Sequence, residues 1–320
     1  MVLTRQWVRA SAGVQGDRGA LISAENGRRW HWSQLLSVTE GAACQLRSQG
    51  VGPGTAVAFS VLPSAEAVIA FMAALRAGAT VVAIDPAAPS AVVKAALRAA
   101  AVGFAVCENL DGGNWGGLPG TSPAGLCALT DRFRPAGRPA VGLDESAPDD
   151  IAVVCFTSGT TGEPKAVPLT HAQVLTGCRS LLRAWEWTAD DVLVSALPLS
   201  HVHGLLVAVA GSLTAGGTLV VRSRFDPELV SADIERYGAS MFFAVPAMWW
   251  RLAEAGVLGR LRSLRLPVSG SAPLSPELFG RLRDELGQAP VERYGMTETM
   301  ILTSNPVRGP RKPGSVGHPL

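Results

Sequence analysis

Short apolar runs typical of buried strands alternate in this sequence with segments whose apolar residues keep helical spacing. Strands are expected at residues 55–61, 80–84, 103–107, 151–156, 192–196, 217–221, 240–245, 264–268 and 290–293. Helices are expected at residues 33–50, 65–77, 171–185 and 227–237, after Pro89 and from Pro246. Strands joined by helices form parallel sheets through right-handed crossovers, with helices on both faces. The alternation therefore predicts an α/β fold with mainly parallel sheets.

The texture changes between residues 108 and 150, where Gly, Pro, Asp and Ser predominate and apolar periodicity is weak. Such a stretch is typical of a long connection between two compact units. We therefore expect two abutting α/β lobes: residues 1–150, which include the connection, and residues 151–320.

The charge balance favours a small-molecule partner. The chain has 28 Lys and Arg against 26 Asp and Glu, a net charge of +2, too even for a basic surface that binds nucleic acid. The five cysteines show no CxxC spacing, so they are expected to be reduced and mostly buried. No segment near the N-terminus resembles a signal peptide, which favours the cytoplasm.

Residues 192–221 contain no Asp, Glu, Lys or Arg and could be mistaken for a membrane span. Pro198 and several glycines interrupt the segment, however. We expect it to form a strand, a loop, a helix of small residues and a second strand inside the fold, not a membrane span.

The sequence FTSGTTGEPKAV, residues 156–167, directly follows a predicted buried strand. Its hydroxyls, two glycines and Lys165 suit a polyphosphate, because small residues let backbone amides approach an anion and the lysine adds charge. The loop lacks the Gly-Lys-Ser/Thr of a Walker A motif, so a P-loop NTPase is disfavoured. A flexible surface turn is the alternative.

Two further clusters, VSGSAPLSPE at 268–277 and ERYGMTET at 292–299, follow later strands. In the second, Tyr294 can stack on a base, Thr297 can donate to a phosphate oxygen and Glu298 can hold a magnesium ion. The segment PLSHVHG at 198–204 carries a His-x-His pair with no acidic or cysteine neighbour, so we expect a pocket-lining His201 in preference to a metal site.

The order and spacing of FTSGTTGEPK, PLSHVHG, VSGSAPL and ERYGMTE resemble the adenylate-forming superfamily of acyl-CoA synthetases, luciferase and nonribosomal peptide synthetase adenylation domains. Upstream, WSQLL, QGVGPGTAVAF and LRAGATVVAIDP resemble landmarks of the same superfamily. The similarity runs from about Leu21 to Leu320, and HVHG and ERYGMTE resemble malonyl-CoA synthetases most closely. The resemblance implies the large N-terminal domain of the adenylate-forming fold.

The resemblance also implies a role for each matching residue. The phosphate loop comprises Thr157, Ser158, Gly159, Thr160, Thr161, Gly162 and Lys165. The nucleotide residues comprise Gly270, Ser271, Ala272, Pro273, Tyr294, Gly295 and Met296, with Thr297 on the α-phosphate and Glu298 on Mg²⁺. The acid site comprises His201, Ser269 and Arg293, and Lys165, Thr297, Glu298 and His201 act in catalysis. Arg293 either pairs with a second carboxylate of a malonate-like acid or forms a surface salt bridge with Glu292 or another neighbour.

The sequence departs from the superfamily pattern at Ala166, where glycine is usual, and at Ser200, where an aromatic residue is common. The superfamily's ribose-binding aspartate, hinge and C-terminal domain with its catalytic lysine have no counterpart in these 320 residues.

The function implied by the resemblance is ATP-dependent formation of an acyl-AMP, followed by transfer to a thiol, either CoA or the phosphopantetheine of a carrier protein. The alternative is a nucleotide- or acyl-binding scaffold with little catalysis. A kinase-like phosphoryl transferase ranks last, because no catalytic aspartate motif is recognisable.

Overall fold

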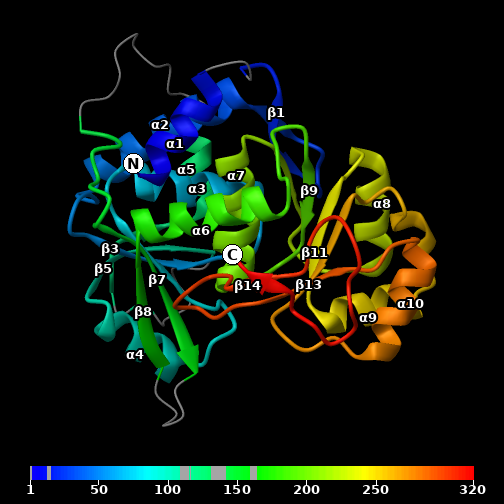
Figure 1. The fold of residues 1–320 in the computed structure, drawn as a ribbon. Helices are drawn as coiled ribbons and strands as arrows, with labels where there is room; N and C mark the ends of the chain where they lie inside the picture. The colour runs from blue at the N-terminus through cyan, green and yellow to red at the C-terminus, as the bar shows by residue number, and fades with distance from the viewer. Residues whose placement is uncertain (1, 13–15, 109–114, 116, 131–141, 159–163) are drawn as a thin grey trace.

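The chain forms two mixed α/β sheets in a computed structural model that describes residues 2–12, 16–108, 115, 117–130, 142–158 and 164–320 (Figure 1). In the described residues, the large sheet has nine strands in the order β15-β14-β13-β12-β11-β9-β10-β1-β2, and the small sheet has six in the order β6-β5-β3-β4-β7-β8. Most neighbouring strands run parallel; β2, β8, β14 and β15 pair antiparallel. The predicted α/β fold with mainly parallel sheets is confirmed.

The strand bounds agree closely with the sequence pattern for the buried strands. The large sheet contains β1 (Gly19–Ser23), β2 (Arg29–His31), β9 (Val192–Ser195), β10 (Thr218–Val221), β11 (Met241–Ala244), β12 (Leu266–Ser269), β13 (Val291–Tyr294), β14 (Thr303–Ser304) and β15 (His318–Pro319). The small sheet contains β3 (Ala56–Ser60), β4 (Thr80–Ala83), β5 (Val102–Cys107), β6 (Gly120–Thr121), β7 (Ile151–Ser158) and β8 (Pro164–Thr170).

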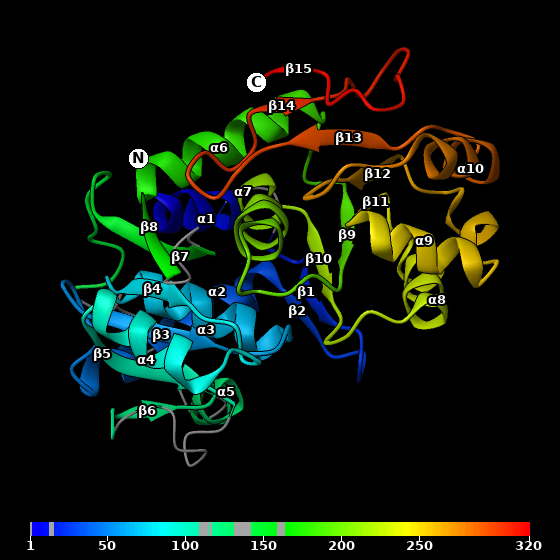
Figure 2. The ribbon, with the colours of Figure 1, turned by 90° about the horizontal axis from the view of Figure 1, so that it is seen from below.

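Helices lie on both sides of each sheet (Figures 1 and 2). Those between the sheets are α1 (Leu3–Ala12), α2 (Trp32–Ser48), α3 (Ala65–Arg76), α6 (His171–Ala184), the π-helix η1 (His203–Ala210) and α7 (Gly211–Ala215), with α5 (Pro123–Thr130) packed on α2 and α3. The outer face of the small sheet carries α4 (Ser90–Ala99). The outer side of the large sheet carries α8 (Pro227–Tyr237), α9 (Pro246–Glu254), the 3₁₀ turn η2 (Leu258–Leu261) and α10 (Pro276–Leu286). One continuous apolar core joins the two sheets through the middle helices.

Local sequence signals explain the outer helices. Helix α8 begins after Asp226, whose side chain accepts from the Leu229 amide at 3.0 Å, and ends at Gly238 with φ +60°. Helix α10 repeats the arrangement, with Ser275 at its start and Gly287 at its end. Capping side chains satisfy free amides, and glycine adopts the left-handed turn that closes a helix. The predicted bounds of 227–237 match α8.

The sheets do not divide at residue 150. Strands β7 and β8, residues 151–170, complete the small sheet, while β1 and β2 come from the N-terminal part and pair with the large sheet through β10. The predicted connection also contains β6 and α5, whose Leu126 is buried. The prediction missed β2 and β6 because they have only three and two residues, and α5 because its apolar run is brief; it also missed β1, which is as long as the predicted β3.

Residues 192–221 form β9, a loop, η1, α7 and β10, as predicted. Among the described residues, none of the helices combines the length and the apolar character required to cross a bilayer. Four of the five cysteines, all except Cys44, are buried.

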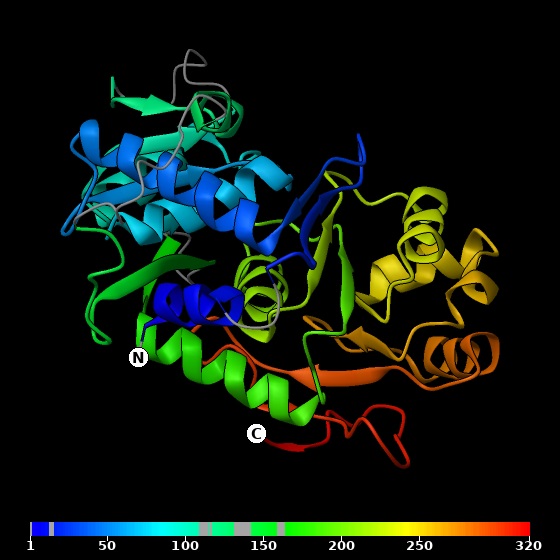
Figure 3. The same cartoon turned by 90° about the horizontal axis from the view of Figure 1, so that it is seen from above.

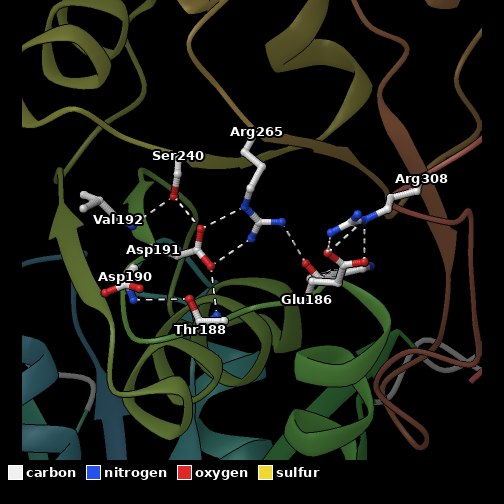
Figure 4. A network of polar contacts seen from close by, with 9 residues as sticks. Glu186, Thr188, Asp190, Asp191, Val192, Ser240, Arg265 and Arg308 are labelled. Atoms are coloured by element: carbon white, nitrogen blue, oxygen red, sulfur yellow. Dashed lines mark hydrogen bonds and ion pairs between the residues drawn. The ribbon is translucent and has the colours of Figure 1, made fainter.

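A polar network fastens the amino ends of β9, β11 and β12 (Figure 4). The buried Asp191 carboxylate accepts from the Ser240 hydroxyl at 2.7 Å and from Arg265 at 2.8 and 3.0 Å. Arg265 also donates to the Trp185 carbonyl at 3.0 Å, and the adjacent Glu186 pairs with Arg308. These contacts fix the relative height of the three strands, and thereby of the loops at their other ends.

Candidate functional site

A cavity of about 420 Å³, here called the central cavity, lies at the carboxyl ends of four neighbouring parallel strands, β9, β11, β12 and β13. Its walls are formed by Leu197, Pro198, His201, Val202, His203, Gly204, Val207, Val245, Ser271, Arg293, Gly295, Met296, Thr297, Met300 and Ile301. Ligands of α/β folds bind at this edge of the sheet, because the loops that follow parallel strands converge there.

Two other cavities adjoin it. The side cavity, about 340 Å³, is lined by Ser269, Ser271, Ala272, Pro273, Leu274, Glu292, Arg293, Tyr294, Gly295, Gly314 and Val316. The α6 cavity, about 360 Å³, is lined by Leu169, Ala172, Gln173, Thr176, Gly177, Ser180, Glu298, Thr299, Met300, Ile301 and Leu320. The central cavity and the side cavity share one wall, because both are lined by Ser271, Arg293 and Gly295.

Arg293 places a buried positive charge in that shared wall. It is 6% exposed, and its Nη2 donates to the Ser271 hydroxyl at 3.3 Å. Burial lowers the pKa of the guanidinium to about 10, so the group stays charged at neutral pH. Within the described part of the chain it has no ion-pair partner, and its Nε has no acceptor. The structure therefore does not place Arg293 in a surface salt bridge.

Gly270 makes this position of Arg293 possible. A Cβ atom at residue 270 would collide with the guanidinium, so the backbone of Gly270 lies directly against it. The next residue, Ser271, has φ +72°, an unusual conformation for a residue with a side chain. The turn after β12 thus brings the Ser271 hydroxyl between Arg293 and His203.

His203, at the start of η1, is the second buried ionisable group of the central cavity. Its Nδ1 lies 3.3 Å from the Ser271 hydroxyl, and its ring stacks on Phe243 with 6.3 Å between centroids. Burial, and then the charge of Arg293, hold the pKa of His203 well below its usual range, so the ring is neutral. Its Nε2 is buried without a partner. If Nδ1 accepts from Ser271, Nε2 carries the proton and is a donor.

Sequence reasoning chose His201 of the His-x-His pair and missed His203. His201 lines the central cavity but is exposed at its mouth, whereas His203 is 7% exposed. The sequence does contain a signal for His203. The apolar run LLVAVA shortly after it indicates a buried helix, and His203 is the first residue of that helix.

The side cavity combines an exposed ring with buried polar atoms. Tyr294 is 51% exposed at the end of β13, next to the turn with Ala272 and Pro273. Glu292 is 4% exposed, its Oε1 has no partner, and burial raises the pKa of its carboxyl. The Ser269 hydroxyl is likewise buried and unpaired. Sequence reasoning treated Glu292 only as a neighbour of Arg293 and missed its place in this cavity.

The remaining residues of ERYGMTE spread over the three cavities. Gly295, Met296 and Thr297 line the central cavity, while Glu298 is exposed and lines the α6 cavity. Leu169 of β8 lines the α6 cavity too, so Glu298 and the hairpin of β7 and β8 border the same cavity. That hairpin carries the predicted phosphate loop.

The structure describes only the two ends of that loop. Thr157 in β7 pairs across the hairpin with Lys165 in β8, whose side chain is exposed. Gly159, Thr160, Thr161 and Gly162 lie outside the described residues, as does the side chain of Ser158.

The two departures from the superfamily pattern have different settings. Ala166 is exposed and pairs with Phe156 in the β7–β8 ladder, an extended conformation that accepts a methyl group. The Ser200 hydroxyl is buried without a partner near the mouth of the central cavity.

Within the described part of the chain, no group of three or more His, Cys, Asp or Glu side chains is arranged to hold a metal ion. Glu298 is a single exposed carboxylate. One carboxylate suits Mg²⁺ that arrives with a nucleotide, because such an ion takes most of its ligands from phosphates and water.

Comparison with known proteins identifies the family to which the chain is similar. The sequence profile of the family described as AMP-binding enzyme matches residues 8–320. An oxalate–CoA ligase from Arabidopsis thaliana is 32% identical over 95% of this chain and 63% of its own length. A mitochondrial malonate–CoA ligase, ACSF3, from Xenopus laevis is 35% identical over 56% of this chain and 34% of its own length.

Two solved structures superpose on all or nearly all of this chain. ATP-bound MatB from Rhodopseudomonas palustris superposes with a TM-score of 0.89 at 30% identity, covering all of this chain and 65% of that one. A malonyl-CoA ligase with methylmalonyl-CoA and AMP bound has a TM-score of 0.84 at 31% identity, covering 98% of this chain and 65% of that one. The chain thus spans less than two thirds of the length of these relatives.

Proposed function

The chain belongs to the AMP-binding enzyme family, and from this premise we propose that it binds the nucleotide and the acid for a ligase that activates a small dicarboxylic acid with ATP. The observation that carries the proposal is the buried charge of Arg293 in the wall of the central cavity, without an ion-pair partner among the described residues. The names of the relatives, oxalate–CoA and malonate–CoA ligases, support the same class of acid.

Arg293 binds the distal carboxylate of the acid. A guanidinium can hold a carboxylate through two parallel hydrogen bonds, and the Nε of Arg293 has no acceptor within the described part of the chain. The Nε2 proton of His203 is a further donor to the acid, because the single proton of the Ser271 hydroxyl is donated to His203 Nδ1. Because a monocarboxylate would leave the guanidinium unpaired, the site favours acids with two carboxylates.

The side cavity holds the base of the nucleotide. The exposed ring of Tyr294 offers a stacking face, and the unpaired carboxyl oxygen of Glu292 can accept from the exocyclic amine of adenine. Ser269, Ala272 and Pro273 also line this cavity, and Gly270 lies between Ser269 and Ser271 in the same turn. Since the two cavities share a wall, the acid and the nucleotide meet there beside Thr297, Gly295 and Met296.

In the first reaction a carboxylate oxygen of the acid attacks the α-phosphorus of ATP, and the bond to the bridging oxygen of pyrophosphate breaks. Thr297 donates to the α-phosphate, while Lys165 and the loop of residues 157–162 bind the β- and γ-phosphates. Glu298 holds Mg²⁺, which neutralises phosphate charge when bound. The residues of the chain contribute position and charge and form no covalent bond to the acid.

In the second reaction a thiol attacks the acyl carbonyl and AMP leaves, which yields a thioester. A relative captured with methylmalonyl-CoA and AMP supports CoA as the thiol. The phosphopantetheine of a carrier protein is the other acceptor to be tested. His201, at the mouth of the central cavity, is positioned to line the path of the incoming thiol or acid.

The test compares acids in a calorimetric titration of the chain and in ATP–pyrophosphate exchange. Oxalate, malonate and methylmalonate should bind to the chain and should support exchange by a protein that also carries the superfamily's C-terminal domain, and propionate should do neither. Thioester formation with CoA, assayed beside a phosphopantetheinylated carrier protein, identifies the acceptor. Absence of nucleotide binding, or preference for propionate over malonate, would contradict the proposal.

A further inference from the structure

Met300, like its neighbour Ile301, lines both the central cavity and the α6 cavity. Its side chain is 4% exposed and packs on helix α6, which Figure 3 shows running beside β14. The indole of Trp185, at the end of α6, donates to the Ser304 hydroxyl at 2.8 Å and fixes the helix against this strand. The wall that contains Met300 is therefore a fixed part of the fold.

The backbone at Met300 is held in an unfavourable conformation. Its φ is +58°, in the left-handed region, which costs a residue with a side chain on the order of 1–2 kcal/mol. The hydrogen bond from the Leu302 amide to the Tyr294 carbonyl, 2.9 Å, closes the loop that contains it. A Cβ atom at Gly295 would collide with the Met300 carbonyl, so glycine there allows the loop to fold tightly.

Gly177 of α6 gives the methionine side chain its place. A Cβ atom at residue 177 would lie 2.6 Å from the Met300 sulfur, far inside contact distance. Small and hydroxyl-bearing residues continue along the same helix in the α6 cavity, among them Ala172, Thr176 and Ser180. The space behind Met300 is thus open, and the thioether closes it from the central cavity.

We propose that Met300 limits the size of the acid, because its side chain closes the central cavity toward α6. Removing the Met300 side chain would open the central cavity toward the α6 cavity, which has a similar volume, while Ile301 remains in the wall between them. The inference rests on the proposed acid-binding function. With both carboxylates of a malonate held near the shared wall, only the substituent on the central carbon can extend toward Met300.

The test measures the affinities of malonate, methylmalonate and n-butylmalonate by calorimetry, with a non-hydrolysable α,β-methylene ATP analogue bound. Met300→Gly should raise the affinity for butylmalonate relative to malonate by about tenfold or more, since discrimination by pocket size is typically of that order per methylene. Glycine also suits the positive φ, so the variant should fold. Gly177→Ala should push Met300 into the central cavity and lower the affinity for methylmalonate relative to malonate.

The control is Leu302→Ala, because Leu302 is 40% exposed, lies two residues away and lines neither cavity. Its affinity ratios should equal those of the unmodified chain. Malonate binding with an unchanged butylmalonate ratio in Met300→Gly would overturn the inference and leave the proposed function intact. Failure of the unmodified chain to bind any dicarboxylate would overturn both. If Met300→Gly does not fold, the affinities for the substituted malonates relative to malonate are measured in Met300→Ala and Gly177→Ala, and the same outcomes apply.

Discussion

Replacing Arg293 by methionine should stabilise the empty protein. Burial lowers the pKa of the guanidinium from 12.5 to about 10. Because the pKa in the folded state is the lower one, the charged form is disfavoured by folding at every pH below about 10. At neutral pH this difference costs about 3 kcal/mol of stability. Methionine has a similar length and no charge, so Arg293→Met should raise the melting temperature by roughly 5 °C.

The same substitution should abolish selectivity for a second carboxylate. Removing one partner of a buried ion pair costs on the order of 3–5 kcal/mol, and hydrogen bonds to a charged group are worth about 1.5–3 kcal/mol each. Taking about 3 kcal/mol, malonate should bind roughly 150-fold more weakly. Propionate has no second carboxylate to pair with the guanidinium. It should therefore bind equally to both proteins or slightly better to the variant.

Differential scanning calorimetry with and without malonate measures both effects in one experiment. The unmodified chain should be stabilised by malonate and the variant should not, although the variant melts higher when empty. Arg283→Met is the matched control, because Arg283 is exposed on α10 and pairs with Asp284. A variant that melts lower than the unmodified chain and still responds to malonate would refute the reasoning about Arg293.

Three other substitutions test separate parts of the site. Lys165→Ala should weaken ATP roughly tenfold, as loss of a charge-assisted contact does, and leave AMP unchanged in calorimetric titration; equal losses would remove Lys165 from the β- and γ-phosphates. Gly270→Ala should displace the guanidinium and weaken malonate as Arg293→Met does, although no charge changes; unaltered malonate affinity would disprove that dependence. Asp191→Asn should lower the free energy of unfolding by about 2 kcal/mol, because two partly exposed contacts to Arg265 lose their charge. Nucleotide affinity should stay the same. Denaturant titration beside nucleotide titration distinguishes this loss of stability from a role in binding.

Sequence reasoning was most successful where one strand or helix buries its own apolar face. Helix α8 and strands β3, β4, β9, β10 and β11 stand within a residue or two of the expected bounds, because the period of the apolar residues depends only on local geometry. The end residues Asp226 and Gly238 also carry local signals.

Assignment of strands to sheets was less predictable. β1 pairs with β10, nearly 200 residues later in the chain, and β2 pairs with β1 at the edge of the sheet. Strand β8, the hairpin partner of β7, alternates buried Val167 and Leu169 with exposed residues. The prediction missed this alternation because it treated residues 156–167 as one phosphate-binding segment. Neither the apolar residues of β1 nor the alternation in β8 indicates on its own which sheet the strand joins.

The candidate site shows the same division. Motifs identified Arg293 and Tyr294, which are the last two residues of β13 and directly precede a loop. The contact of Gly270 with Arg293 and the burial of His203 and Glu292 arise from packing between strands, and one sequence contains no record of such distances. Met300 was not singled out, because its importance depends on a glycine on α6 more than a hundred residues earlier.

The pairing of β1 with β10 has a consequence for how the chain is made. Residues 19–23 leave the ribosome long before residues 218–221 exist, so the first strand of the large sheet must wait while almost 200 residues are synthesised. Strands β7 and β8 are likewise needed to finish the small sheet after β3 to β6 have emerged. Contacts so distant in sequence slow folding. Neither half of the chain, cut at residue 150, holds a complete sheet, so two such fragments should regain structure only when mixed.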